Sequence, residues 1–280
     1  NIKTMDRQES ETSHGHHHDH VDGATCSKRF AQELLNQKYD EIIAAKEKWT
    51  DSLFAPTDDS LYSGKTEFSE SRGSQVPDWI GGDSGVNYRS YAKNHVSKNK
   101  GRYEWKRLSD NDRGYNIIKI PKEIKEEEDI LTEDINQGEL GNCYFLSALS
   151  SLAEVPQRIQ NMFPNDKVHK NGVFECLVYV HGYPMKICVD DYFPFMADSN
   201  EIAFTKVSTK STRNIWPMIL EKAWAKVNKN YENTIAGNSA EAFEFLTPAP
   251  IDIMYHEAHK DIIFKKLKEA DDTELKRENN

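Results

Sequence analysis

The sequence predicts an α+β fold, because its apolar residues follow two different periods. They recur every three or four positions in residues 29–49, 143–155 and 215–227, which is typical of helices that pack against a core. They alternate with polar residues in 173–180 and 185–193, which is typical of strands. The four residues between these two strands predict a β-hairpin.

The N-terminal part of the chain is expected to contribute one helix and many loops. Residues 1–28 are polar and lack apolar periodicity, so they predict a disordered tail. An amphipathic helix is expected between Arg29 and Trp49. The chain is then rich in Ser, Gly, Asp and Asn as far as residue 101, which favours loops. We therefore treat 29–101 as a helix followed by a loop-rich region.

The tail contains five histidines within seven residues, namely His14, His16, His17, His18 and His20. Imidazole nitrogens bind zinc and copper, but the cluster lacks a cysteine or a second histidine group at the spacing of a zinc finger. We interpret the segment as a solvated tail and keep metal binding as the alternative.

Residues 102–247 carry most of the predicted core. A glycine turn, Gly138–Gly141, leads into a helix that contains Cys143 in its first turn. This helix is expected to end at Val155, because the residue before a proline is disfavoured in helical conformation.

Prolines mark the expected boundaries of the later elements. Pro217 is tolerated only in the first turn of a helix, so it fixes the start of the helix in 215–227. A short helix is expected before Pro248, and the sequence Pro-Ala-Pro at 248–250 predicts a subdomain boundary. Residues 248–280 are predicted to be a linker and one charged helix.

Composition limits the possible partners. The chain of 280 residues has 36 basic and 46 acidic side chains, and this acidic balance argues against a nucleic-acid partner. No run of about 18 apolar residues could span a membrane, and the first residues lack a secretory signal. We expect a soluble, cytoplasmic protein. Four cysteines, at positions 26, 143, 176 and 188, are too few for a disulfide scaffold, so free thiols are expected.

Cys143 is the candidate nucleophile. A cysteine at the start of a helix lies at the positive end of the helix dipole, which favours the thiolate over the thiol. Its backbone N–H, and the side-chain amide of Gln137 across the glycine turn, are suited to donate hydrogen bonds to an oxyanion. The alternative is that Cys143 is a small core residue.

The segment QGELGNCYFLSAL, from Gln137 to Leu149, resembles the active-site segment of the calpain family of cysteine proteases. Further segments resemble this family in the same order along the chain: DSLY (59–62), YEWKR (103–107), VDDYFP (189–194), WPMILEKAWAKVN (216–228) and SAEAFEFLT (239–247). The resemblance extends from about Tyr103 to Thr247. It implies the first, cysteine-bearing and mainly helical subdomain of a papain-like protease core, with Cys143 as nucleophile and Gln137 in the oxyanion hole.

The resemblance also implies a second subdomain that supplies a histidine base and an asparagine. The end of the chain contains His256 and His259, but no histidine in the family's glycine-histidine-alanine context and no asparagine motif after it. We therefore expect the chain to stop early in the second subdomain. It would need that subdomain as a partner and would be inactive alone.

Calcium is the cofactor that the resemblance implies. Asp134 matches a family aspartate that binds calcium, whereas Asn214 stands where the family has a glutamate, so weaker binding is expected. The acidic residues 126–129, with Glu133, are an alternative source of charge or simply a solvated loop.

The function predicted from the sequence is that of a cysteine endopeptidase that hydrolyses peptide bonds in protein substrates. Two alternatives remain open. The chain could be a catalytically silent, calpain-like interaction module, or a transglutaminase-like acyltransferase, which also has a cysteine at a helix start.

Overall fold

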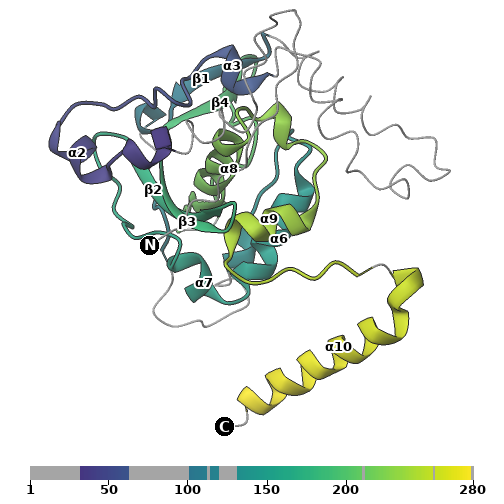
Figure 1. Ribbon diagram of the computed structural model, residues 1–280. Helices are drawn as coiled ribbons and strands as arrows, with labels where there is room; N and C mark the ends of the chain where they lie inside the picture. The colour runs from purple at the N-terminus through teal and green to yellow at the C-terminus, as the bar shows by residue number, and fades with distance from the viewer. Residues whose placement is uncertain are drawn as a thin grey trace, which may run out of the picture.

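The computed structural model describes residues 32–62, 101–111, 114–119, 131–209, 212–254 and 256–278. The histidine-rich tail, Cys26 and the acidic residues 126–129 lie outside these ranges. The described part contains helices and two small antiparallel sheets, which confirms the α+β expectation (Figure 1).

The predicted hairpin is present. Strands β2 (Val173–Val180) and β3 (Tyr183–Asp190) pair antiparallel along their whole length. His181 and Gly182 form the turn between them, and both have positive φ values, 51° and 79°. A two-residue turn of this type matches the twist of the strands that it joins.

A second sheet joins segments that are distant in the sequence. Strand β1 (Tyr103–Arg107) pairs antiparallel with β4 (Tyr192–Met196). Only Asp191 separates β4 from β3, so the chain passes directly from one sheet into the other. This pairing was not predicted, because nothing in either segment indicates its partner.

The three main helices build the core. Helix α6 (Cys143–Ala153) and helix α9 (Ser239–Leu246) pack on each other, and α8 (Trp216–Val227) runs through the interior (Figure 1). Phe145 of α6 stacks on Trp224 of α8, with ring centroids 5.6 Å apart. These helices confirm the predicted starts at Cys143 and near Pro217.

The predicted helix over 29–49 is wrong in its extent. Residues 32–36 are helical, the helix breaks at 37–38, and α2 (Tyr39–Ala44) follows. The break has a cause in the core: Gln37 turns inward, donates to Asp51 at 2.9 Å and accepts from Lys226 at 2.7 Å. A continuous helix would not permit this contact.

Short helices connect the larger elements. They are α3 (Asp58–Leu61), α7 (Pro156–Gln160), and the 3₁₀ turns η3 (Leu108–Asn111), η5 (Leu131–Asp134) and η6 (Glu232–Thr234). Pro156 starts α7 directly after α6, in agreement with the predicted end of that helix.

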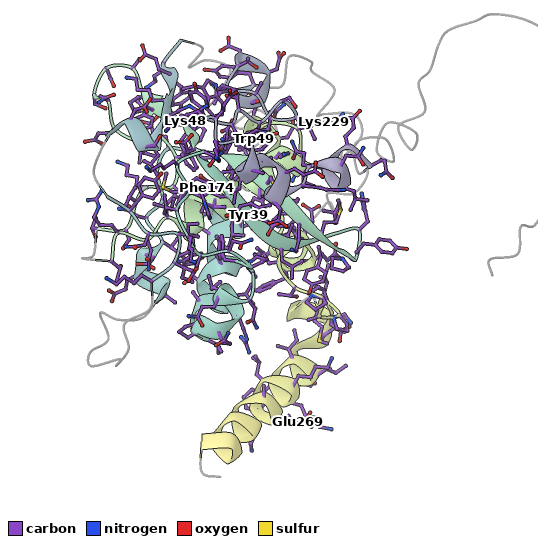
Figure 2. The ribbon with its side chains drawn as sticks, turned by 90° about the vertical axis from the view of Figure 1, so that its left-hand side faces the viewer. Tyr39, Lys48, Trp49, Phe174, Lys229 and Glu269 are labelled. Atoms are coloured by element: carbon purple, nitrogen blue, oxygen red, sulfur yellow. The ribbon has the colours of Figure 1, made fainter. Side chains whose placement is uncertain are left out.

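The last helix is α10 (His256–Glu278), which confirms the predicted charged helix. It projects away from the rest of the molecule, as the position of Glu269 shows (Figures 1 and 2). No helix in the described part of the chain is both long and apolar enough to cross a membrane.

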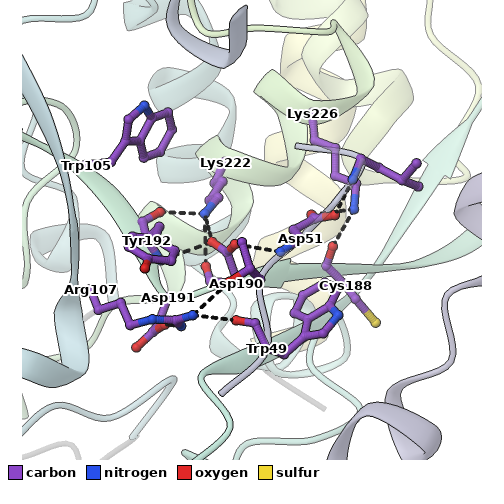
Figure 3. A network of polar contacts seen from close by, with 12 residues as sticks. Trp49, Asp51, Trp105, Arg107, Cys188, Asp190, Asp191, Tyr192, Lys222 and Lys226 are labelled. Atoms are coloured by element: carbon purple, nitrogen blue, oxygen red, sulfur yellow. Dashed lines mark hydrogen bonds and ion pairs between the residues drawn. The ribbon is translucent and has the colours of Figure 1, made fainter. Parts of the chain in front are cut away.

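Buried ion pairs connect α8 to the β2–β3 hairpin and to the N-terminal segment (Figure 3). Lys222 forms an ion pair with Asp190, and Lys226 forms one with Asp51 at 2.6 Å; all four side chains are fully buried. Burial lowers the pKa of Lys226, and the nearby Asp51 opposes this effect. Replacing water by paired carboxylates is what makes buried ammonium groups tolerable.

Arg107 makes a third ion pair of the same kind, with Asp191. Its guanidinium also donates to the Trp49 carbonyl oxygen at 2.9 Å. This contact ties β1 and the N-terminal segment to the start of β4.

Cys176 and Cys188 are free, buried thiols, as predicted. Cys176 is opposite Ile187 and Cys188 is opposite Glu175 in the hairpin register, so the two thiols occupy opposite faces. Burial raises the pKa of both, to about 12 for Cys188.

Candidate active site

The turn before α6 is held from two sides. The Glu139 N–H donates to the Ala203 carbonyl oxygen at 2.8 Å, and the Ala236 N–H donates to the Gly141 carbonyl oxygen at 3.0 Å. At Gly138 any Cβ would overlap the carbonyl oxygens of Ala203 and Phe204. The glycine in this position therefore permits close contact between two backbone segments.

Cys143 is the first residue of α6, and its side chain is exposed. Among the described residues its backbone N–H has no hydrogen-bond partner. The rest of the helix is anchored in the core by Phe145 and Leu149, which are fully buried. The arrangement presents a reactive group to solvent from a rigid element.

Tyr144 fixes the start of the helix on the other side. Its hydroxyl donates to the Thr234 carbonyl oxygen at 2.9 Å and accepts from Trp224 Nε1 at 3.0 Å. The ring packs against Gly237, where a Cβ would overlap it. This role of Gly237 could not be inferred from the sequence, because its contact partner, Tyr144, lies more than ninety residues away along the chain.

Gln137 lies at the other end of the same turn, and its side chain is exposed. Its Nε2 donates to the Leu140 carbonyl oxygen at 3.0 Å, which occupies one of the two amide hydrogens. The second hydrogen can point to another acceptor. A cavity of about 420 Å³ opens beside Gln137, and both Arg102 and Glu201 line it.

Asn142 precedes Cys143 and is the N-cap residue of α6, yet its side chain does not cap the helix. Its Nδ2 instead donates to Glu221 Oε1 at 2.7 Å. Thr205 donates to the same carboxylate twice, from its N–H at 3.1 Å and from its hydroxyl at 2.6 Å. Burial raises the pKa of Glu221, and the bonds from Thr205 and Asn142 oppose this rise.

Asp134 is buried and satisfied by nitrogen donors. Its Oδ2 accepts from Asn214 Nδ2 at 2.7 Å and from Trp216 Nε1 at 2.9 Å. Asn214 is itself held by Lys119, whose N–H donates to Oδ1 at 2.8 Å. The structure thus brings together the two residues compared with a calcium site, but through an N–H group that faces the carboxylate.

The donor set around Asp134 does not fit calcium as it stands. Calcium takes six to eight oxygen ligands, whereas the Asp134 carboxylate here receives N–H donors. Nowhere in the described ranges do three or more His, Cys, Asp or Glu side chains form a group that could hold a metal ion.

His256 and His259, which lack the family's histidine motif, belong to the C-terminal helix. His256 begins α10 and His259 lies at a kink within it, and this helix leads away from the body that carries Cys143 (Figure 1). Within the described ranges, no histidine hydrogen-bonds to Cys143. Gln137 and Cys143 thus lie at the two ends of one turn, and their joint role in a site stays a prediction.

Similarity to known proteins agrees with the geometry of this turn. A sequence profile described as "Calpain family cysteine protease" matches residues 49–276. Calpain-12 of Homo sapiens is 31% identical over 146 residues, 51% of this chain and 20% of that protein. A calpain of Schistosoma mansoni is 31% identical over 118 residues, 41% of this chain and 15% of that protein.

The calpain-1 catalytic subunit of Macaca fascicularis is 32% identical over 117 residues, 41% of this chain and 16% of that protein. The matched part of the chain spans a fifth or less of the length of these relatives. The family profile, in contrast, covers most of the chain, including Gln137 and Cys143. The chain belongs to the calpain family of cysteine proteases.

Proposed function

We propose that the chain carries the nucleophile of a calpain-type cysteine endopeptidase that hydrolyses peptide bonds in proteins. The Cys143 thiolate attacks the scissile carbonyl carbon, and the new S–C bond gives a tetrahedral oxyanion. The C–N bond then breaks and the leaving amine takes a proton from a histidine. Water hydrolyses the resulting acyl-enzyme and regenerates the thiol.

One observation carries this proposal: Cys143 is exposed at the first position of a helix whose other side is buried. The helix end favours the thiolate, and the unpartnered Cys143 N–H is available to the oxyanion. Gln137 would supply a second donor, from the amide hydrogen that Leu140 does not use. Charged residues beside the neighbouring cavity are suited to contact a peptide.

The base is proposed to come from a histidine outside residues 1–280, on a second subdomain that also supplies the asparagine. This follows from the absence of a suitable histidine motif after Cys143 in the sequence. A thiol without a positioned base cannot protonate the leaving amine efficiently. We therefore propose that residues 1–280 alone do not turn over peptides.

Calcium is proposed to bind weakly, if at all, at Asp134. Asn214 supplies an amide in place of a carboxylate, and its N–H₂ group already faces Asp134. The three described cysteines are free thiols, which suits a reducing compartment such as the cytoplasm.

The test is to combine the chain with the downstream subdomain of its own gene and to follow cleavage of an unfolded protein. Cys143→Ser is the blank. We expect cleavage by the combination and none by residues 1–280 alone. Cysteine-dependent cleavage by the chain alone would contradict the missing-base proposal. A combination that binds the unfolded protein but never cleaves it would favour the silent interaction module.

A further inference from the structure

Asn142 occupies the N-cap position of α6, but its side chain does not cap the helix. Asparagine is among the preferred N-cap residues because its Oδ1 accepts from an N–H of the first helical turn. Asn142 makes no such bond. Its Oδ1 is instead buried with no hydrogen-bond partner among the described residues.

An unpaired buried oxygen costs free energy, so something must hold the amide in this orientation. That partner is Glu221, whose Oε1 accepts from Asn142 Nδ2 at 2.7 Å. The carboxylate cannot move toward or away from Asn142, because two donors of Thr205 hold it at 3.1 Å and 2.6 Å. Glu221 itself projects from α8, which is buried along its length.

We propose that Glu221 is a positioning residue for Cys143: it holds the Asn142 side chain away from the end of α6 and so keeps the helix uncapped beside the thiol. This inference rests on the proposed function, in which Cys143 is the nucleophile.

The chemical consequence follows from what a cap does. The Phe145 N–H already donates to the Asn142 backbone carbonyl oxygen at 2.9 Å. A capping side-chain oxygen would therefore turn toward the Tyr144 N–H and would place a negative dipole end beside Cys143. With Asn142 held back, the positive end of the helix dipole acts on the sulfur without that opposition. The open helix end would favour the thiolate.

The surroundings of Glu221 indicate that it acts on Cys143 through its hydrogen bond to Asn142. Its hydrogen-bond partners among the described residues, Asn142 and Thr205, are uncharged. Lys222 is next in sequence but forms an ion pair with Asp190. Burial raises the pKa of Tyr231, and the charges of Glu221 and Asp190 raise it further, so this phenol is a titratable group that is sensitive to the carboxylate.

The test is a double-mutant cycle on residues 1–280, with the midpoint pH of Cys143 alkylation by iodoacetamide as the readout. In Glu221→Met the side chain has no oxygen to accept from Asn142 Nδ2, so Asn142 is released to cap α6. We expect the midpoint to rise by about 0.5, the size of an effect at an exposed helix end. In an Asn142→Ala background the same substitution should leave the midpoint unchanged.

Glu232→Met is the matched control, because Glu232 is also a buried carboxylate and does not hydrogen-bond to Asn142. It should leave the midpoint unchanged in both backgrounds. A merely structural role for Glu221 would lower the unfolding temperature without an Asn142-dependent change in the midpoint, and this result would overturn the proposal. A lower midpoint in both backgrounds would also overturn it, because the carboxylate would then act through its charge alone.

A second variant covers the case in which Glu221→Met does not fold. Thr205→Val removes one hydrogen bond to the carboxylate and keeps its charge, so a smaller rise that again requires Asn142 is expected. No rise with this variant would overturn the proposal. A wild-type chain that is alkylated first at another cysteine would overturn the proposed function, and this inference with it.

Discussion

Helix α8 contacts buried polar groups on two sides, and the two sides differ in how completely those groups are hydrogen-bonded. On one side the Lys226 ammonium donates to Asp51, to Gln37 and to the Cys188 carbonyl oxygen, at 2.6, 2.7 and 2.8 Å. All three of its N–H donors are used. On the other side Glu221 holds Asn142, whose Oδ1 has no partner in the described part of the chain.

We interpret the Lys226 side as part of the structural scaffold and the Asn142 side as part of the candidate site. The lysine side joins the N-terminal segment, the hairpin and α8 through saturated contacts, as expected for groups that only hold the fold together (Figure 3). The Asn142 side keeps an unpaired oxygen and an uncapped helix end next to Cys143. Proteins retain such local costs mainly where function requires them.

The saturated side should show the largest effect when it is broken. Lys226→Met leaves the Asp51 carboxylate buried without its cation, which should lower the free energy of unfolding by about 3–5 kcal/mol. Urea unfolding measures this loss. Lys229→Met, at an exposed lysine two residues after α8, should change it by less than about 0.5 kcal/mol. Equal effects of the two variants would contradict the role of the ion pair.

The second-largest loss of stability is expected from a substitution in the turn before Cys143. Gly138→Ala forces a Cβ onto two backbone oxygens and should cost about 1–3 kcal/mol, with slower alkylation of Cys143 because the turn shifts. Gly141→Ala is the matched control, since its Cβ would meet a flexible atom of Ile235 at 3.3 Å. If Gly141→Ala lowers the stability more than Gly138→Ala does, the proposed role of the close backbone contact at Gly138 is contradicted.

Tyr39 is an exception on the scaffold side, because its hydroxyl is also a buried atom without a partner in the described ranges. Burial, with smaller effects of Glu175 and other charges, raises the pKa of Tyr39 from 10.0 to about 12. Between these two pH values the unfolded chain loses the phenol proton and the folded chain keeps it. Stability therefore falls as pH rises through this window.

Tyr39→Phe should remove about 1 kcal/mol of that loss at pH 11 and should not destabilise the protein at pH 7. Unfolding curves at the two pH values measure both effects. Tyr183→Phe, at a tyrosine that is 73% exposed, is the control and should leave the pH dependence unchanged. A destabilised Tyr39→Phe at pH 7 would mean that the hydroxyl has a partner.

The smallest expected effect is that of calcium. Since Asn214 and Trp216 already donate to Asp134, calorimetry should give heat only at high calcium concentration. A tight site that Asp134→Ala abolishes would show that the amide yields to the ion. A tight site that this variant leaves intact would place the ligands on other residues.

The residues of the candidate site could be predicted from the sequence, but the residues that hold them in place could not. Gln137, the glycine turn and Cys143 lie within seven consecutive residues, so local pattern and resemblance sufficed. Glu221 was not found, because its partners are at positions 142 and 205 and a glutamate in a helical pattern is expected to face solvent.

The same limit explains what was predicted of the fold. The hairpin and the helix after Cys143 are local patterns, and both were confirmed. Lys226 and Asp51 lie 175 residues apart, so their ion pair, and the helix break at Gln37 that accompanies it, could not be inferred from spacing. The β1–β4 pairing is hidden for the same reason. The proposed subdomain boundary at 248–250 stays a prediction.

The central claim is that Cys143 is the activated thiol of this chain, and limited alkylation followed by peptide mapping tests it most directly. At neutral pH and substoichiometric iodoacetamide, Cys143 should be labelled first, because it alone among the described cysteines is exposed and lies at a helix start. Cys143→Ser should remove the fast-reacting fraction. Earlier labelling of Cys176 or Cys188 in the folded chain would contradict the account.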